Sequence, residues 1–178
     1  ALPIYLKLAE KGVWVSIIAY IVLSIGQIAF AAIVHSSALQ ANGFNNVTDI
    51  MGNIAILIGL RLARIPADSD HVYGHWKIES IASLISSFIM FFVGFEVLRE
   101  TVMTLLSGKE EAIDPLGALV GLFSAFVMLG VYLYNRALAK KTNSQALSAA
   151  SKDNLSDAVT SIGTVVAILA SSVGWEWL

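Results

Sequence analysis

Long apolar stretches, each ended by a short polar or charged stretch, divide the chain into five segments that we expect to be helices. Each segment is close to or longer than the roughly 20 residues that an α-helix needs to cross a bilayer. A short amphipathic stretch, residues 1–11, precedes them. The expected spans are residues 12–34, 38–62, 76–106, 116–134 and 145–173. The pattern therefore predicts an all-α fold, a polytopic transmembrane helix bundle.

The composition also points to a lipid environment. Of the 178 residues, 57% are hydrophobic and 13% are charged, whereas soluble domains usually carry about 25% charged residues. The net charge of −2 leaves no large basic surface for a nucleic acid, so we expect none as a partner. The chain has no cysteine, which excludes disulfides and thiolate metal sites. No nucleophile beside a base and no cofactor motif is evident, so we expect neither an enzyme nor a cofactor.

The basic residues predict how the spans are oriented. They gather on alternate connections, where they are Lys7, Lys11, Arg61, Arg64, Lys77, Arg136, Lys140 and Lys141. Cytoplasmic loops of membrane proteins carry an excess of Lys and Arg. We therefore expect a multi-pass protein of the cell membrane with a cytoplasmic N-terminus. The aromatic end Trp175-Glu176-Trp177 resembles an anchor that leads into another span, so we expect a chain truncated before a sixth helix.

Two pairs of polar residues interrupt the apolar pattern. Asn45 and Asp49 lie in the second expected span, and Asp153 and Asp157 lie in the fifth. A spacing of four places both members of a pair on one face of a helix. Carboxylates inside a membrane face the bundle interior or a water-filled path, and three of them together repel unless a cation or protons intervene. We predict a cation site between these helices; the alternative is that both pairs only hydrogen-bond neighbouring helices.

The first ligand position has a second candidate. Asn46 lies three residues before Asp49, so it also falls near the same helix face. We rank Asn45 first because its spacing equals that of Asp153 and Asp157. An all-oxygen ligand set favours hard cations such as Mn²⁺, Mg²⁺ or Ca²⁺, whereas Zn²⁺ commonly takes imidazole or thiolate.

A second cluster of possible ligands lies between the second and third spans. Asp68, His71 and His75 fall in one short loop, which can bring three ligands together. The alternative is that Gly74 and His75 form a tight turn at the start of a helix while Asp68 remains a solvated charge. The sequence leaves this accessory metal site open.

Together these motifs resemble the cation diffusion facilitator family over residues from about 10 to 175. The matching residues are Ser37-Ala38-Leu39, Asn45 with Asp49, Pro66-Ala67-Asp68, Tyr73-Gly74-His75 with Glu79, and Asp153 with Asp157. The resemblance implies a six-helix transmembrane domain, followed by a cytoplasmic domain, in a homodimer that exports divalent metal in exchange for protons. It implies that Asn45, Asp49, Asp153 and Asp157 form the transport site. It also suggests that Lys77 and Glu79 take part in salt bridges between helices; the alternative is that both are interfacial charges.

The identity of the four site residues suggests which metal is carried. Zinc-transporting members usually have a His in one of these positions, whereas one Asn and three Asp resemble the bacterial manganese exporters. We therefore expect a Mn²⁺ efflux transporter whose five spans, residues 1–178, form the transmembrane domain. The alternatives are a broad-range exporter of Zn²⁺, Fe²⁺ or Co²⁺ and a non-transporting membrane scaffold.

Overall fold

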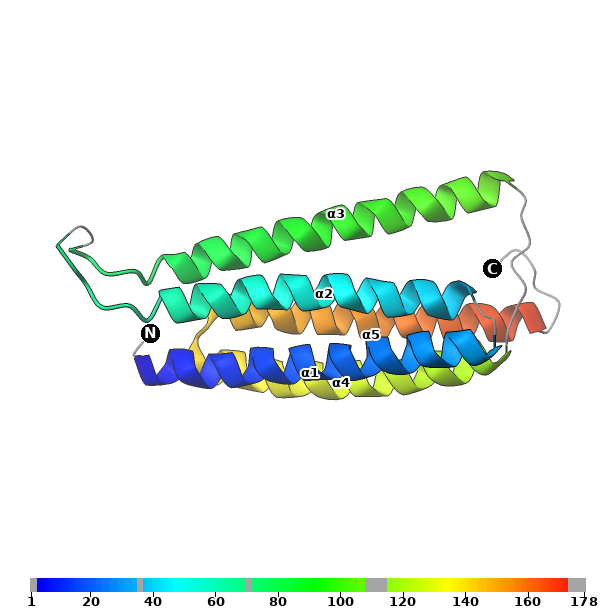
Figure 1. Ribbon diagram of the computed structural model, residues 1–178, viewed down its shortest axis with the longest axis horizontal. Helices are drawn as coiled ribbons and strands as arrows, with labels where there is room; N and C mark the ends of the chain where they lie inside the picture. The colour runs from blue at the N-terminus through cyan, green and yellow to red at the C-terminus, as the bar shows by residue number, and fades with distance from the viewer. Residues whose placement is uncertain (1–2, 35–36, 70–71, 108–114, 173–178) are drawn as a thin grey trace.

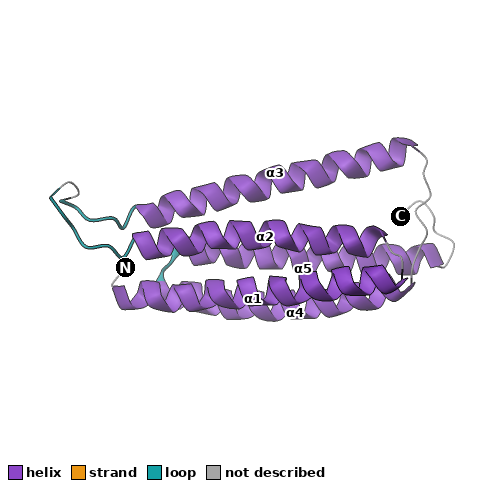
Figure 2. Cartoon of the chain, in the orientation of Figure 1, coloured by secondary structure: helices purple, strands orange, loops and turns teal. Residues whose placement is uncertain are grey.

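The computed structural model describes residues 3–34, 37–69, 72–107 and 115–172, and within these ranges the chain forms five helices (Figure 1). The helices are α1 (Pro3–Val34), α2 (Ser37–Leu62), α3 (Ile78–Ser107), α4 (Pro115–Thr142) and α5 (Gln145–Ser172). No strand occurs in the described ranges (Figure 2). The all-α prediction is confirmed.

Four of the helices begin within two residues of the expected positions, and α1 begins nine residues early. Pro3 is its first residue, a position where the missing N–H of proline costs nothing. Leu6 and Ala9 are buried, so the amphipathic stretch 1–11 contributes to the bundle beyond the expected span. Helix α4 also runs past its expected end, through a basic last turn with Lys140 and Lys141, where cations favour the helix C-terminus.

Helices α1, α2, α4 and α5 lie side by side as one unit (Figure 1). Helix α3 packs on α2 and α5, and its C-terminal end diverges from the other helices. Gly59 allows α2 to approach α3 closely, because a Cβ atom at this position would overlap the side chain of Ala82. Small residues commonly permit such close packing between membrane helices.

Two apolar clusters fill the four-helix unit. The larger one consists of Leu6, Ala9, Val13, Ile17, Ile56, Leu57, Leu60, Ala63, Ala139, Ala146, Leu147 and Ala150. The smaller one consists of Tyr20, Leu23, Met128 and Ala158. Ile50, next to Asp49 in α2, packs against both clusters, and Asp153 and Asp157 lie in α5 between Ala150 of the larger cluster and Ala158 of the smaller one.

Three helices of the described chain are long and apolar enough to cross a membrane: Ile4–Ile33, Ile78–Glu96 and Gly117–Thr142. Helices α2 and α5 are also long, with 26 and 28 residues, or about 40 Å each at a rise of 1.5 Å per residue. Their polar residues lower their hydropathy, and these are the two helices that carry the predicted site. The arrangement is that of a multi-pass membrane bundle.

A tight reversal joins α4 to α5. Asn143 adopts a left-handed backbone conformation with φ of 51°, which Asn tolerates better than most residues. The N–H of Ser144 donates to the carbonyl of Ala139 at 3.2 Å, closing the end of α4, and the Ser144 hydroxyl accepts from the N–H of Leu147 at 3.1 Å, opening α5. This reversal sets where α5 begins and therefore where its carboxylates lie.

Candidate metal site

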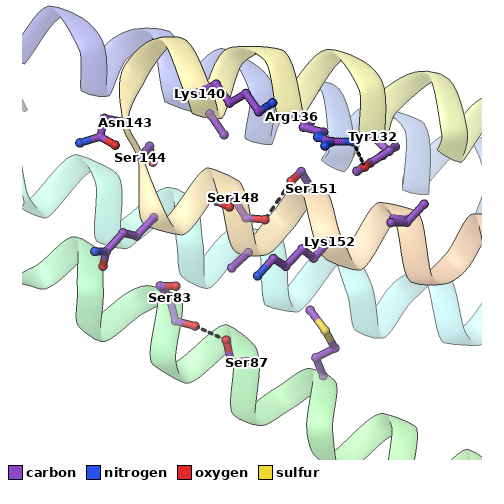
Figure 3. Close-up of a pocket in the computed structure, with 15 residues that line it drawn as sticks. Ser83, Ser87, Tyr132, Arg136, Lys140, Asn143, Ser144, Ser148, Ser151 and Lys152 are labelled. Atoms are coloured by element: carbon purple, nitrogen blue, oxygen red, sulfur yellow. Dashed lines mark hydrogen bonds between the residues drawn. The ribbon is translucent and has the colours of Figure 1, made fainter.

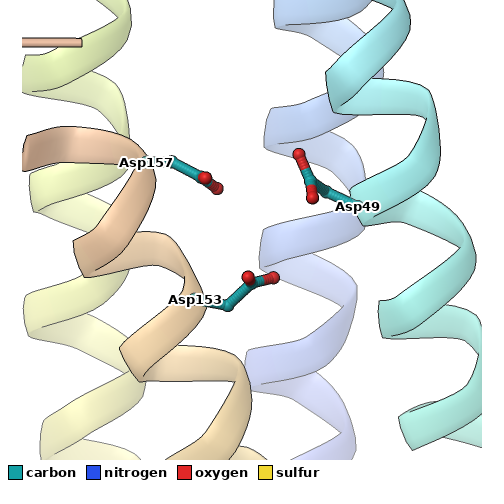
Figure 4. A group of neighbouring side chains, drawn as sticks. All are labelled: Asp49, Asp153 and Asp157. Atoms are coloured by element: carbon teal, nitrogen blue, oxygen red, sulfur yellow. The ribbon is translucent and has the colours of Figure 1, made fainter. Parts of the chain in front are cut away.

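Three carboxylates converge between α2 and α5. Asp49 on α2 faces Asp153 and Asp157 on α5 (Figure 4), and one oxygen from each lies within 4.8 Å of the others. All three side chains are half-buried. The predicted pairing of carboxylates across these two helices is therefore present in the structure.

The site lies near the middle of the bundle. Asp49 is 12 residues from the first residue of α2 and 13 from its last, or about 18–20 Å from either end at 1.5 Å per residue. Because the hydrocarbon core of a bilayer is about 30 Å thick, this depth is near its midplane. Three carboxylates so close together at this depth need a neutralising cation or protons.

The two asparagines before Asp49 lie in different surroundings. Asn46 is half-buried, and its side-chain amide donates to Gln27 Oε1 at 2.8 Å. Gln27 in turn donates to Ser124 Oγ at 2.9 Å, which links α2, α1 and α4. Asn45 is exposed. The side chain of Asn46 is therefore engaged by α1, and Asn45 as the first ligand stays a prediction.

The loop between α2 and α3 brings two of the three predicted accessory residues together. His75 Nε2 lies 3.9 Å from a carboxylate oxygen of Asp68. Gly74 has a φ of +75°, in the left-handed region that favours glycine, so this segment is a tight turn before α3. His71 lies outside the described residues. The tight turn that we gave as the alternative to a metal site is present. Asp68 and His75 nevertheless lie close together across it.

A separate groove of about 760 Å³ lies over α5 and is flanked by α3 and α4 (Figure 3). Its charged lining residues are Arg136, Lys140 and Lys152, accompanied by serines that include Ser83, Ser87, Ser148 and Ser151. None of the described residues that line it carries a carboxylate. A basic groove of this kind is unsuited to a divalent cation, so the cluster of Asp49, Asp153 and Asp157 is the better candidate metal site among the described residues.

Sequence reasoning missed a set of polar residues behind the carboxylates. The Tyr20 hydroxyl on α1 donates to Asp157 Oδ2, and Asn154 Nδ2 donates to the Tyr20 oxygen at 3.1 Å. Ser16 and Asn135 continue the set through Asn154 Oδ1. The sequence did offer a signal for Asn154, because this polar residue lies between Asp153 and Asp157 in an apolar span. No spacing rule pointed to Tyr20 or Ser16.

Glu79 connects α3 to the start of α5. Its Oε1 accepts from the Ser144 hydroxyl at 2.6 Å and from the N–H of Ala146 at 3.4 Å. Lys77 lies over the ring of Trp76, 5.6 Å from its centroid. Glu79 therefore joins two helices through hydrogen bonds to a helix N-terminus. Among the described residues neither Glu79 nor Lys77 forms the salt bridge that the resemblance suggested.

The chain matches known proteins along nearly its whole length. It is 49% identical over 173 residues to the manganese efflux system protein MneS of Bacillus subtilis, covering 97% of this chain and 60% of the relative. It is 44% identical over 173 residues to the uncharacterized transporter YdbO of the same organism, with the same coverage. It is 29% identical over 177 residues to the manganese efflux system protein MneP, also of Bacillus subtilis, covering 97% of this chain and 59% of the relative.

The chain therefore spans about 60% of the length of these relatives. Residues 13–178 match the family described as the cation efflux transmembrane domain. That match includes α1 from residue 13 onward, helices α2 to α5 and every carboxylate of the site. The chain belongs to the cation efflux family.

Proposed function

We propose that this chain is the transmembrane part of a Mn²⁺ exporter, and that Asn45, Asp49, Asp153 and Asp157 bind the transported ion. The observation that carries the proposal is the approach of three carboxylates to within 4.8 Å, contributed by two helices near the middle of a membrane bundle. A divalent cation between them relieves their repulsion and satisfies their oxygens.

The ligand chemistry supports manganese as the cargo. The proposed ligands are three carboxylates and one amide, with neither imidazole nor thiolate. Oxygen ligands suit Mn²⁺, whereas Zn²⁺, which generally binds a given site more tightly, prefers nitrogen and sulfur. The names of two relatives, MneS and MneP, agree with this choice.

The driving force that we propose is proton exchange. When the ion leaves, the three carboxylates lose their counter-charge, so protons are the natural replacement. Metal release would then be coupled to proton uptake from the receiving side. We further propose that the working protein is a homodimer in the cell membrane, with the N-terminus in the cytoplasm.

The first test is calorimetric titration of MnCl₂ into the purified protein and into Asp157→Ala. We expect Mn²⁺ to bind the wild type and binding to be lost in the variant, because the site keeps only two carboxylates. Asp68→Ala is the matched control, since it removes a carboxylate from the loop and leaves the bundle intact. Asp49→Ala and Asp157→Ala should also fail to protect manganese-stressed cells.

Each alternative predicts a different titration. If Mn²⁺ binding survives in Asp157→Ala and disappears in Asp68→Ala, the ion binds at Asp68 and His75 and the proposed site is wrong. If the wild type binds no divalent metal, the chain behaves as a scaffold. If vesicles transport Zn²⁺ as well as they transport Mn²⁺, the protein is a broad-range exporter.

A further inference from the structure

The hydroxyl of Tyr20 belongs to the metal site although its helix supplies no ligand. We infer that Tyr20 is a positioning residue, which fixes the orientation of the Asp157 carboxylate and thereby the site's preference for Mn²⁺ over Zn²⁺. The inference rests on the proposed function. Tyr20 is 0% exposed, lies in the middle of α1, and donates from its hydroxyl to Asp157 Oδ2.

Asn154 determines the direction of the hydrogen bond between Tyr20 and Asp157. Asn154 Nδ2 donates to the Tyr20 oxygen at 3.1 Å, so that oxygen acts as an acceptor toward Asn154. A phenol has a single proton to donate. The proton is therefore directed at Asp157, and one lone pair of Oδ2 is committed to Tyr20.

A buried network holds Asn154 in turn. Its Oδ1 accepts from Ser16 Oγ and from Asn135 Nδ2, each at 3.0 Å, so the amide nitrogen must face Tyr20. Asn135 Nδ2 also contacts Ser16 Oγ at 2.7 Å. Ser16, Asn135 and Asn154 are fully buried and lie on α1, α4 and α5. Buried, connected networks of this kind restrict the conformations of their members.

The backbone around the network leaves room for it. Gly12 on α1 faces Asn135, and a Cβ atom there would lie 2.7 Å from Asn135 Oδ1. A side chain at this position would displace the amide. The chain of contacts from Asn135 through Asn154 and Tyr20 to Asp157 is thus built into the packing of three helices.

Fixing one carboxylate affects selectivity as well as affinity. Groups that orient metal ligands typically contribute 10–100-fold to metal affinity. The intrinsic order of affinities places Zn²⁺ above Mn²⁺, so a site can favour Mn²⁺ over Zn²⁺ only through its ligand types and geometry. Freeing the Asp157 carboxylate removes part of the geometric constraint and lets the site adapt to the smaller coordination number of Zn²⁺.

A purely structural role for Tyr20 is the competing explanation. The ring packs in the apolar cluster with Leu23, Met128 and Ala158. Tyr20→Phe keeps the ring and removes only the hydroxyl, so it separates the two roles. Tyr5→Phe is the matched control, because it makes the same change on the same helix at a residue that is 37% exposed.

The experiment is titration of MnCl₂ and of ZnCl₂ into the wild type, Tyr20→Phe and Tyr5→Phe, with thermal unfolding of each metal-free protein. We expect Tyr20→Phe to bind Mn²⁺ about 10-fold more weakly or worse, and to lose less affinity for Zn²⁺, so that the ratio of the two constants falls. Tyr5→Phe should bind both ions as the wild type does. A lower unfolding temperature with both constants unchanged would overturn the positioning role.

The design separates this inference from the proposed function. A wild type that binds no Mn²⁺ contradicts the proposed function and the inference with it, whereas normal binding in Tyr20→Phe contradicts the inference alone. If Tyr20→Phe does not fold, Ser16→Ala takes its place, since it removes a donor to Asn154 one step further from the ion. That variant should weaken Mn²⁺ binding in the same direction by a smaller factor, and an unchanged Mn²⁺ constant would overturn the inference.

Discussion

Asn45 and Asn46 are adjacent in sequence, yet the structure gives them different environments. Asn46 is tied to Gln27 on α1, and Asn45 is exposed one turn before Asp49. We expect Asn45→Ala to weaken Mn²⁺ binding by about 10-fold or more, because loss of a ligand should cost at least as much as loss of a group that orients one. Asn46→Ala should mainly lower stability, by about 1 kcal/mol, through the lost hydrogen bond.

Paired titration and unfolding measurements on the two variants check this assignment. Each variant acts as the control for the other, since both remove one amide from neighbouring positions of the same helix. The reverse result, with Mn²⁺ binding lost in Asn46→Ala and intact in Asn45→Ala, would make Asn46 the ligand.

The carboxylates were predictable from sequence, but their surroundings were not. Asp49, Asp153 and Asp157 stand out because charge is rare in the spans and because the spacing of four repeats in α2 and α5. Tyr20 and Ser16 resemble ordinary members of an apolar helix. Their role depends on the rotation of α1 about its axis and on its packing against α5, which periodicity in one helix does not determine.

At the scale of elements, the contacts at the start of α5 determine where two of the three carboxylates, Asp153 and Asp157, lie. Ser144 caps the helix from within the chain, and Glu79 accepts from Ser144 and Ala146 across the gap from α3. A carboxylate at a helix N-terminus is favourable because it meets unpaired N–H groups and the positive end of the helix dipole. Glu79 therefore anchors α5 to α3.

Removing this anchor should destabilise the bundle. We expect Glu79→Ala to lower the free energy of unfolding by about 1–2 kcal/mol, because it leaves the Ser144 hydroxyl and the Ala146 N–H without their acceptor. Thermal or denaturant unfolding in detergent measures the change. Glu96→Ala is the control on the same helix, since its pairing with Arg99 is exposed and of little energetic value. Equal stability of the two variants would contradict the anchoring role.

The helices themselves were largely predictable, and the exceptions have physical causes. Hydropathy placed four of the five helix starts within two residues, because Pro and Gly or polar stretches interrupt the apolar pattern there. The early start of α1 was not predicted because Lys7, Glu10 and Lys11 interrupt the apolar pattern before residue 12. Burial of Leu6 and Ala9 against other helices keeps that stretch helical.

At the scale of the whole molecule, the two sides of the metal site are packed differently. The twelve-residue apolar cluster draws its members from residues 6–17 of α1, 56–63 of α2, Ala139 of α4 and 146–150 of α5. In these antiparallel helices, all of these positions lie between the carboxylates and the end of the bundle that carries the basic residues. On that side of the site, apolar side chains therefore fill the interior between the described helices.

The basic end of the bundle should face the cytoplasm, and the chain is well suited to a test because it contains no cysteine. Tyr73, in the loop between α2 and α3, is 92% exposed, and Leu106, in the last turn of α3, is 79% exposed. The 30 residues of α3 extend about 45 Å, so these two positions lie on opposite sides of a bilayer. Since Arg61, Arg64 and Lys77 flank the loop, we expect a membrane-impermeant thiol reagent to label Leu106→Cys in intact cells and Tyr73→Cys only after permeabilisation. The wild type gives the background labelling. Labelling of Tyr73→Cys in intact cells would show that the orientation is opposite to the predicted one, and the proposed direction of transport would then be wrong.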